Sequence, residues 1–212
     1  MRDRFFFPLA AVVAGAFVFT AIQPFADRPP VGPVSGGGRN AEDVTVAGRE
    51  LHRFLPGNYD GIAIVNPADG GAPVVRITRL ANEIYEIPQS GPHIVLDADV
   101  ELAFEARPIE VEIVARAAGD FAASKFEANY FARPEGESGW CPFDLTPQWQ
   151  TYSFQFTTPK RTDHEGYDYV GVRPVVPDSK RRIMELQSIR IHAVGPKLQG
   201  DAAGVSRATC TS

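Results

Sequence analysis

Beyond residue 44, apolar and polar side chains alternate with a period of two over most of the chain. The alternation is clearest in residues 109–116 (IEVEIVAR), 125–131 (KFEANYF) and 149–157 (WQTYSFQFT). Because successive side chains of a β-strand point to opposite faces of a sheet, this pattern predicts strands that bury one face and expose the other to water.

Shorter β-branched runs separated by Pro, Gly, Asn and Asp predict further strands. They are residues 62–65, 73–79, 93–97, 100–105, 168–175 and 183–194. No window in this part of the chain repeats its apolar residues every 3.6 positions over three turns, as a helix would. Since this many strands need a partner sheet to cover their apolar faces, we expect an all-β fold, a two-sheet antiparallel sandwich over residues 44–196.

A different pattern occupies the N-terminus. Residues 5–22 carry no charge over 18 positions, and Arg2 and Arg4 precede them. A helix of this length crosses a bilayer core of about 30 Å, and the preceding arginines favour an N-terminus inside the cell. Residues 1–26 are therefore expected to form a cytoplasmic stub and a transmembrane signal-anchor helix.

A cleaved signal peptide is the alternative for the same residues. Its apolar region is normally about 7–15 residues long and ends in small residues at a cleavage site. Here the chain continues as TAIQPFADR without an A-x-A pattern, which favours the uncleaved anchor. Both versions export the remainder, so the expected location is the inner membrane, single-pass, with the domain in the periplasm or outside the cell.

Two segments flank the expected sandwich. Residues 27–43 contain three prolines followed by three consecutive glycines, which is typical of a linker, and residues 197–212 are expected to form a flexible C-terminal tail. Cys141 and Cys210 lie far apart in sequence. In an oxidising compartment they could pair and fix the tail, whereas Cys210 could equally remain a free thiol.

Charge and motifs exclude several functions. A net charge of −5 argues against nucleic-acid binding, which needs a clearly basic face. The chain contains no G-x-S-x-G elbow, phosphate-binding loop or dinucleotide-binding glycine pattern. Asp163, His164 and Glu165 are consecutive loop residues, which rarely converge on one ion, so no metal site and no catalytic residues are predicted.

The second half of the chain resembles the jelly-roll of carbohydrate-binding modules of the galactose-binding-like type. The resemblance covers residues 108–195 well and residues 44–107 loosely. It is carried by Trp149 at the start of a strand of alternating aromatics, by the sequence Gly171-Val172-Arg173-Pro174, and by a closing strand with Ile189 and Ile191. It implies a jelly-roll sandwich that binds carbohydrate without catalysis.

Members of this group often have an acidic residue before the closing strand that helps to hold a structural calcium. Gln187 stands at about that position here, with Glu185 as a possible substitute. We therefore assign no calcium site, and no other cofactor is expected.

Sugar recognition needs an aromatic face for the apolar side of a pyranose and polar side chains for its hydroxyls. If the polar faces of the strands share one surface, the polar groups would be Glu127, Asn129, Ser153, Gln155 and Arg173, with Trp140 and Tyr169 for stacking. The alternative is that these are ordinary solvated residues and that Trp140 plugs an end of the sandwich. Trp149, beside Pro147, is expected in the core.

The predicted function is a membrane-anchored, exported module that binds an envelope or extracellular polysaccharide or oligosaccharide during export, assembly or attachment. Its partners would be the glycan and, through residues 5–22, the membrane. The alternative is a structural sandwich domain that docks on another envelope protein and binds no sugar, and a hydrolase or lyase on the same scaffold is a third, less favoured hypothesis. The basic run Lys180-Arg181-Arg182 could contact anionic polysaccharide or lipid headgroups, although a solvated turn explains it as well.

Overall fold

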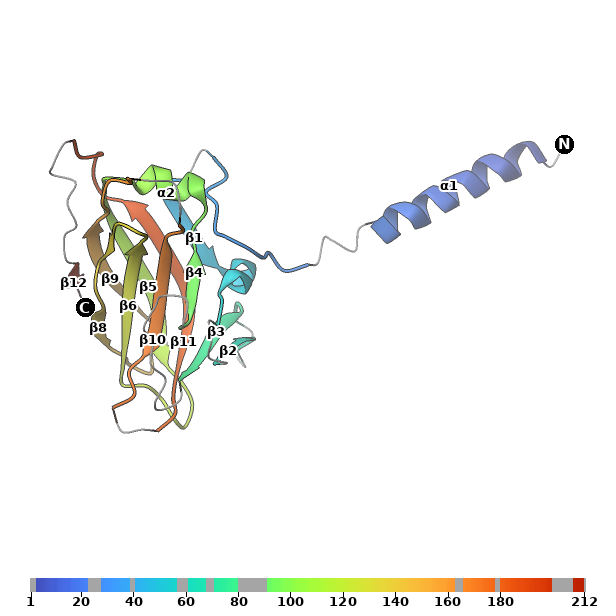
Figure 1. Cartoon of the computed structure of the whole chain (residues 1–212). Coiled ribbons are helices and arrows are strands. Elements are labelled where there is room, and N and C mark those ends of the chain that lie inside the picture. Colours follow the sequence, from blue (N-terminus) through green and yellow to red (C-terminus); the bar gives the residue numbers. More distant parts are fainter. Residues whose placement is uncertain are drawn as a thin grey trace. The chain divides into compact units, whose positions relative to one another are not determined.

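The computed structural model describes residues 3–22, 28–38, 41–56, 61–67, 71–79, 91–162, 166–177, 180–199 and 208–211 (Figure 1). The chain divides into two compact units, residues 1–30 and residues 31–212. Each unit is described by itself.

The first unit contains one helix, α1 (Asp3–Ile22). Every side chain described along it, from Phe7 to Ala21, is exposed within the structure. Among the described residues, no helix combines the length and the apolar character needed to span a membrane.

The second unit is a β-sandwich, as the period-two alternation predicts. Its larger sheet has seven antiparallel strands in the order β12-β9-β5-β11-β3-β2, with β1 paired to β11. These strands are β1 (Asp43–Ala47), β2 (Ile62–Val65), β3 (Val74–Arg79), β5 (Pro108–Ala117), β9 (Gln150–Thr157), β11 (Arg182–Ala193) and β12 (Thr209–Thr211).

The smaller sheet has five antiparallel strands built around β6. Strand β6 pairs with β10 on one side and with β7 and β8 on the other, and β4 lies beyond β10. The members are β4 (His93–Val95), β6 (Lys125–Ala132), β7 (Gly136–Glu137), β8 (Cys141–Asp144) and β10 (Tyr169–Pro174). Figure 1 shows the two sheets stacked as two layers.

The core lies between the two sheets and contains the apolar half of each alternating strand. Val111, Phe154 and Ile189 of the larger sheet are fully buried, as are Phe126 and Val172 of the smaller one. Burial of apolar area is the main favourable term in folding, so the alternation in sequence translates directly into the sandwich. The predicted two-sheet architecture is confirmed.

One predicted strand is wrong. Residues 100–105 belong to a short helix, α2 (Ala98–Phe104), which closes one end of the sandwich in Figure 1. The Asp97 side chain accepts a hydrogen bond from the Ala98 N–H at the helix start, and Val100 and Phe104, one turn apart, are both buried. N-terminal capping and an i, i+4 apolar pair explain the helix, and Val100 is the only β-branched residue in the segment that was expected to be a strand. A 3₁₀ helix, η1 (Gly48–Arg53), follows β1.

Both flanking segments contact the sandwich. Val34, in the segment expected to be a linker, is buried, and its N–H donates to the Val95 carbonyl at 2.7 Å. At the other end, residues 209–211 of the expected tail form β12 on β9, and Cys210 forms a disulfide with Cys141. The disulfide resolves the two alternatives that the sequence left open for the cysteines.

Candidate functional site

The outer face of the five-stranded sheet carries most of the residues predicted to bind a ligand. Outward-pointing side chains of β6 and β10 alternate with buried ones, and antiparallel pairing sets them side by side. The cross-strand pairs on this face are Arg173 with Glu127, Gly171 with Asn129, and Tyr169 with Phe131. Backbone register alone therefore gathers Glu127, Asn129, Tyr169 and Arg173, as the sequence predicted.

Trp140 lies across this face just before β8 begins. The Arg173 guanidinium carbon is 3.7 Å from the centre of the indole ring, a close cation–π contact. Arg173 is itself held by Glu127, with Nε and Nη2 each 2.8 Å from Oε2. The ring is half-buried and fixed by a charged pair on the sheet beneath it.

Gly171 makes this close approach possible. A Cβ atom added at this position would lie 3.3 Å from Trp140 and 3.2 Å from Phe131. Phe131 meets the indole edge-on, with ring centres 5.7 Å apart. Because glycine has no side chain, both rings can settle onto β10, and the indole is thereby held against the sheet.

Asn129 belongs to the support of the site. It is fully buried, and its Nδ2 donates to Glu137 at 2.7 Å while its Oδ1 accepts from the Ser138 hydroxyl at 2.9 Å. The Ser138 hydroxyl also accepts from the Tyr130 N–H at 2.9 Å. These bonds fix residues 137–139, the segment that leads into Trp140.

Tyr169 offers little ring surface for stacking. It is 9% exposed, and its ring lies edge-on to His93 with centres 5.5 Å apart. His93 is also buried; its desolvation lowers its pKa, so it is neutral near pH 7. The two rings cover the sheet beside Phe131, which leaves Trp140 as the more accessible aromatic group.

Two predicted site residues lie elsewhere. Ser153 and Gln155 point outward from β9, which belongs to the seven-stranded sheet, so they face the opposite side of the sandwich. Their alternation with Phe154 was predicted correctly, but the assumption that all the polar faces share one surface is wrong. A sandwich has two outer faces, and alternation alone cannot assign a strand to one of them.

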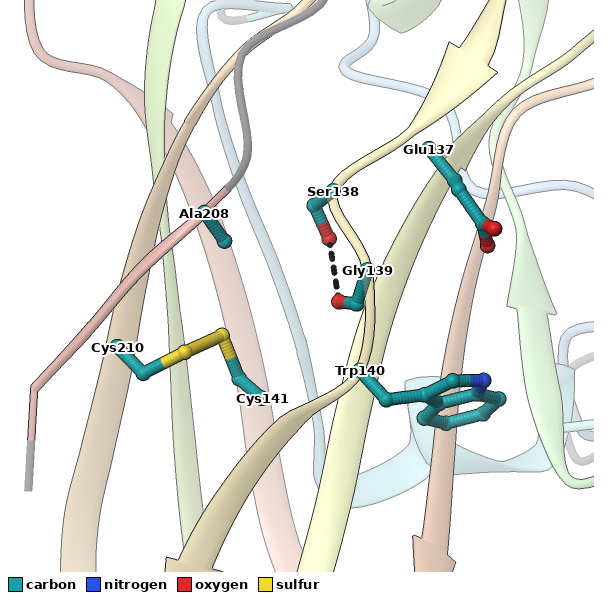
Figure 2. A pocket seen from close by; sticks show the side chains of 7 residues that line it. All are labelled: Glu137, Ser138, Gly139, Trp140, Cys141, Ala208 and Cys210. Atoms are coloured by element: carbon teal, nitrogen blue, oxygen red, sulfur yellow. Dashed lines mark hydrogen bonds between the residues drawn. A yellow bond between two sulfur atoms is a disulfide. The ribbon is translucent and has the colours of Figure 1, made fainter.

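A pocket of about 400 Å³ opens beside Trp140. Figure 2 shows the Trp140 and Glu137 side chains on one side of segment 137–141, with the Cys141–Cys210 disulfide and Ala208 on the other. The Ala208 N–H donates to the Ser138 carbonyl at 3.0 Å. The disulfide and the C-terminal strand thus hold the backbone of the segment that presents the indole.

A buried charged cluster lies at the α2 end of the sandwich and was not predicted. Arg161 Nη1 is 3.0 Å from Glu101 and 3.2 Å from Asp168, and the Tyr130 hydroxyl donates to Asp168 at 2.7 Å. The four residues come from four separate segments, so no local sequence pattern announces the cluster. Glu101, Tyr130 and Asp168 adjoin apolar residues in the sequence, but Arg161 lies in a polar stretch, TTPKRTDHEG, that gives no sign of burial.

Burial dominates the electrostatics of this cluster. It raises the pKa of Asp168 to about 7, against the hydrogen bond from Tyr130 and the charge of Arg161, and it also raises the pKa of Glu101. Asp168 is only 4% exposed. The cluster therefore ties α2 to the smaller sheet and offers little surface to a ligand.

Metal ligands do not gather in the described part of the chain. No group of three or more His, Cys, Asp or Glu side chains there could hold an ion. Glu185, considered as a calcium ligand from the sequence, instead accepts hydrogen bonds from Arg76 and Arg116. Residues 163–165 lie outside the described residues.

Trp149 was expected in the core, and this prediction is wrong. The indole is half-buried on the outer face of the seven-stranded sheet, with the Arg116 guanidinium carbon 4.4 Å from its ring centre. The residue directly precedes β9, whose first residue, Gln150, lies across from Ala115, the neighbour of Arg116 on β5. Its position at a strand start suggested burial, but the alternation that buries Tyr152 puts residue 149 on the outside.

No protein-family model matches the chain, and no curated protein matches its sequence. Among solved structures, the CBM22-1 xylan-binding domain from Paenibacillus barcinonensis Xyn10C matches with a TM-score of 0.50 at 11% identity, over 72% of this chain and 94% of that one. The CBM22-2 xylan-binding domain of the same protein gives 0.49 at 11%, over 66% and 91%. A structure described as "CBM4 structure and function" gives 0.42 at 12%, over 76% and 99%.

At this level of identity the likeness shows the fold alone. The second unit is a β-sandwich whose fold is similar to that of the CBM22-1 domain, and the resemblance stated from the sequence is confirmed at the level of the fold.

Proposed function

We propose that the protein binds a polysaccharide or oligosaccharide on the outer face of the five-stranded sheet and catalyses no reaction on it. The observation that carries the proposal is the Trp140 ring, which is half-buried and held against β10 by Arg173 and Gly171. A fixed aromatic ring next to polar groups is the arrangement that stacks on a pyranose and bonds its hydroxyls.

The charge around Trp140 favours a neutral glycan. The positive charge of Arg173 is cancelled by Glu127, and Glu137 adds one negative charge at the same edge. A chain bearing carboxylates would therefore be repelled, whereas hydroxyl groups could bond to either side of the Arg173–Glu127 pair. Because the matching CBM22 domain is described as xylan-binding, xylan is the first neutral glycan to test.

The state of the carboxyl groups supports a role without catalysis. Glycoside cleavage needs two accessible carboxyl groups on either side of the scissile bond. Glu127 is hydrogen-bonded to Arg173, and Asp168, whose pKa is raised to about 7, is buried at the α2 end of the sandwich. Neither can flank a sugar bond at Trp140, and Glu137, the exposed carboxyl group at this edge, is one group where cleavage needs two.

The test is affinity gel electrophoresis of the full chain through native gels containing xylan or another neutral glycan. Retardation should weaken by about tenfold or more in Trp140→Ala, because truncating a central aromatic group removes the stacking surface. Trp149→Ala is the matched control, since it removes the same side chain from the opposite face. Equal mobility with and without every neutral glycan tested would disprove the proposal.

The proposed location rests on the uncharged run of residues 5–22, which would anchor the chain in the inner membrane with the sandwich outside the cytoplasm. An exported domain also suits a Cys141–Cys210 disulfide, since such bonds persist in oxidising compartments. Retention of the chain in membrane pellets after alkaline carbonate washing, and its release by Phe17→Asp with Val13→Asp, would test the anchor. A chain that stays in the soluble fraction would contradict it.

A further inference from the structure

A single row of side chains crosses the outer face of the seven-stranded sheet. Register pairs Glu185 on β11 with Arg116 on β5 and with Arg76 on β3, and Trp149 continues the row beyond Arg116. The row runs from β3 over β11 and β5 to the residue before β9, or about 14 Å at the usual spacing between strands. We call it the Trp149 row.

Hydrogen bonds fix the charged members of the Trp149 row. Glu185 Oε1 accepts from Arg76 Nε at 3.1 Å and Nη2 at 2.6 Å, and Oε2 accepts from Arg116 Nε at 2.9 Å and Nη2 at 2.7 Å. Burial acts to raise the pKa of Glu185, but the bonds from the two arginines lower it below its ordinary value. The carboxylate is therefore ionised at neutral pH, and two cations with one anion leave a net charge of +1.

The arginines retain capacity for another acceptor. Each uses Nε and Nη2 on Glu185, and neither Nη1 has a hydrogen-bond partner among the described residues. The Arg76 side chain is 46% exposed, whereas that of Glu185 is 4% exposed. The arginines are therefore accessible to solvent, whereas the Glu185 carboxylate is buried beneath them, so an approaching ligand meets positive charge.

Other charges on this face lie farther along the strands and do not cancel the positive end. Glu112 is four residues from Arg116 on the same strand, about 13 Å away, which exceeds the distance over which salt screens exposed charges. At that far end, Glu112 and Asp43 both form ion pairs with Arg190, and Glu110 lies 3.6 Å from His192. That end carries excess negative charge, so the positive charge is concentrated at Trp149.

We propose that the Trp149 row is a second binding site, which takes a polysaccharide bearing carboxylates, such as a uronic-acid chain. Trp149 offers an indole ring for the apolar face of the sugar, and Arg76 and Arg116 offer guanidinium groups that match a carboxylate. The site lies on the opposite face from Trp140 and has the opposite preference for charge. It goes beyond the proposed function and shares with it only the class of ligand.

The experiment uses the full chain in affinity gels containing polygalacturonate, methyl-esterified polygalacturonate or xylan. Trp149→Ala should weaken retardation by polygalacturonate by about tenfold or more and leave xylan binding unchanged, while Trp140→Ala should do the reverse. Methyl esterification should abolish binding at the Trp149 row, since it removes the charge but keeps the sugar ring. Arg76→Gln is a second variant that keeps Trp149 and Arg116, and it too should weaken polygalacturonate binding selectively.

The outcomes separate the two proposals. Polygalacturonate binding that survives both Trp149→Ala and Arg76→Gln would overturn the second site, as would a chain that binds xylan but not polygalacturonate. Binding of polygalacturonate that depends on Trp149, with no neutral glycan bound, would support the second site and count against the site at Trp140.

Discussion

The two outer faces of the sandwich use the same three residue types in different proportions. The chain has two tryptophans, and each lies against an arginine that is hydrogen-bonded to a glutamate on the neighbouring strand. At Trp140 one arginine meets one glutamate and the charges cancel. At Trp149 a second arginine, Arg76, joins the same glutamate and leaves +1. On the two proposals, one extra cation changes the charge of the ligand that a face would favour.

The faces also differ in what holds the tryptophan. Trp149 adjoins a regular strand, and the β5–β9 ladder sets its position. Trp140 lies in the segment before β8, which depends on Asn129, Ser138 and the disulfide. The Trp140 site should therefore be the more sensitive of the two to changes away from the sheet.

Removal of the disulfide should have the largest effect. Its two cysteines are 69 residues apart, and closing a loop of that length stabilises a fold by about 4 kcal/mol in the chain-entropy model. Cys141→Ser with Cys210→Ser should lower the free energy of unfolding in urea by about that amount. Xylan binding should weaken as well, because segment 137–141 loses its anchor, whereas polygalacturonate binding should persist. Equal loss of both would show that the disulfide supports the whole fold rather than the Trp140 side.

Asp168 and Glu185 should make the free energy of unfolding depend on pH in opposite directions. The pKa of Asp168, raised to about 7, means that the folded chain holds this proton more tightly than the unfolded chain, whose ordinary value is 3.8. Its contribution to stability is full at low pH and is lost as the pH rises toward and through 7. Glu185, whose pKa is lowered, contributes above its ordinary value of 4.5 and loses that contribution as the pH falls below it.

The substitution Asp168→Asn tests the loss of stability that is expected as the pH rises. Between pH 5 and pH 8 the wild type should lose roughly 3 kcal/mol of unfolding free energy through this group, and the variant should not. The measurement is the difference between the urea stability curves of the two proteins at each pH. Parallel curves would mean that Asp168 is ionised across the range.

The sequence predicts the sandwich well because its information is local. Alternation at Phe126, Tyr130 and Phe154 reports directly which face of a strand is buried, and all three are in the core. It fails at residues 100–105, where the Asp97 cap and two buried apolar residues four positions apart favour a helix over the expected strand. Glu127 and Arg173 were grouped correctly because β6 and β10 are neighbours in the sheet, although that long-range pairing is not visible in the sequence.

The rest of the two sites depends on long-range pairing. Nothing near Ser153 or Gln155 tells which sheet β9 joins, and nothing near Glu185 reveals that Arg76, 109 positions earlier, bonds to it. Such contacts are fixed by the order of strands in the sheet, which a single sequence does not display. The Trp149 row was missed for this reason.

Neutralising the two glutamates compares the faces directly. Glu185→Gln should lower the unfolding free energy by roughly 2 kcal/mol, because it leaves two guanidiniums facing an uncharged, buried amide. Glu127→Gln should cost about 1 kcal/mol, since Glu127 binds one arginine and its side chain is 25% exposed. Thermal or urea unfolding at pH 7 measures both. A larger loss for Glu127 would reverse the ranking that burial predicts.

Replacing an arginine with lysine should have the smallest effect and separates charge from shape. Lysine keeps the positive charge but loses the planar group that lies against the indole. Contacts of this kind contribute about 1 kcal/mol, and an equal loss of binding free energy would lower the affinity for the glycan roughly fivefold. Arg173→Lys should weaken xylan binding by about that factor and spare polygalacturonate. Arg116→Lys should weaken polygalacturonate binding by a similar factor and spare xylan. If Arg116→Lys bound polygalacturonate as tightly as the wild type, the positive charge alone would explain the contribution of Arg116, and its planar group would have no part in binding.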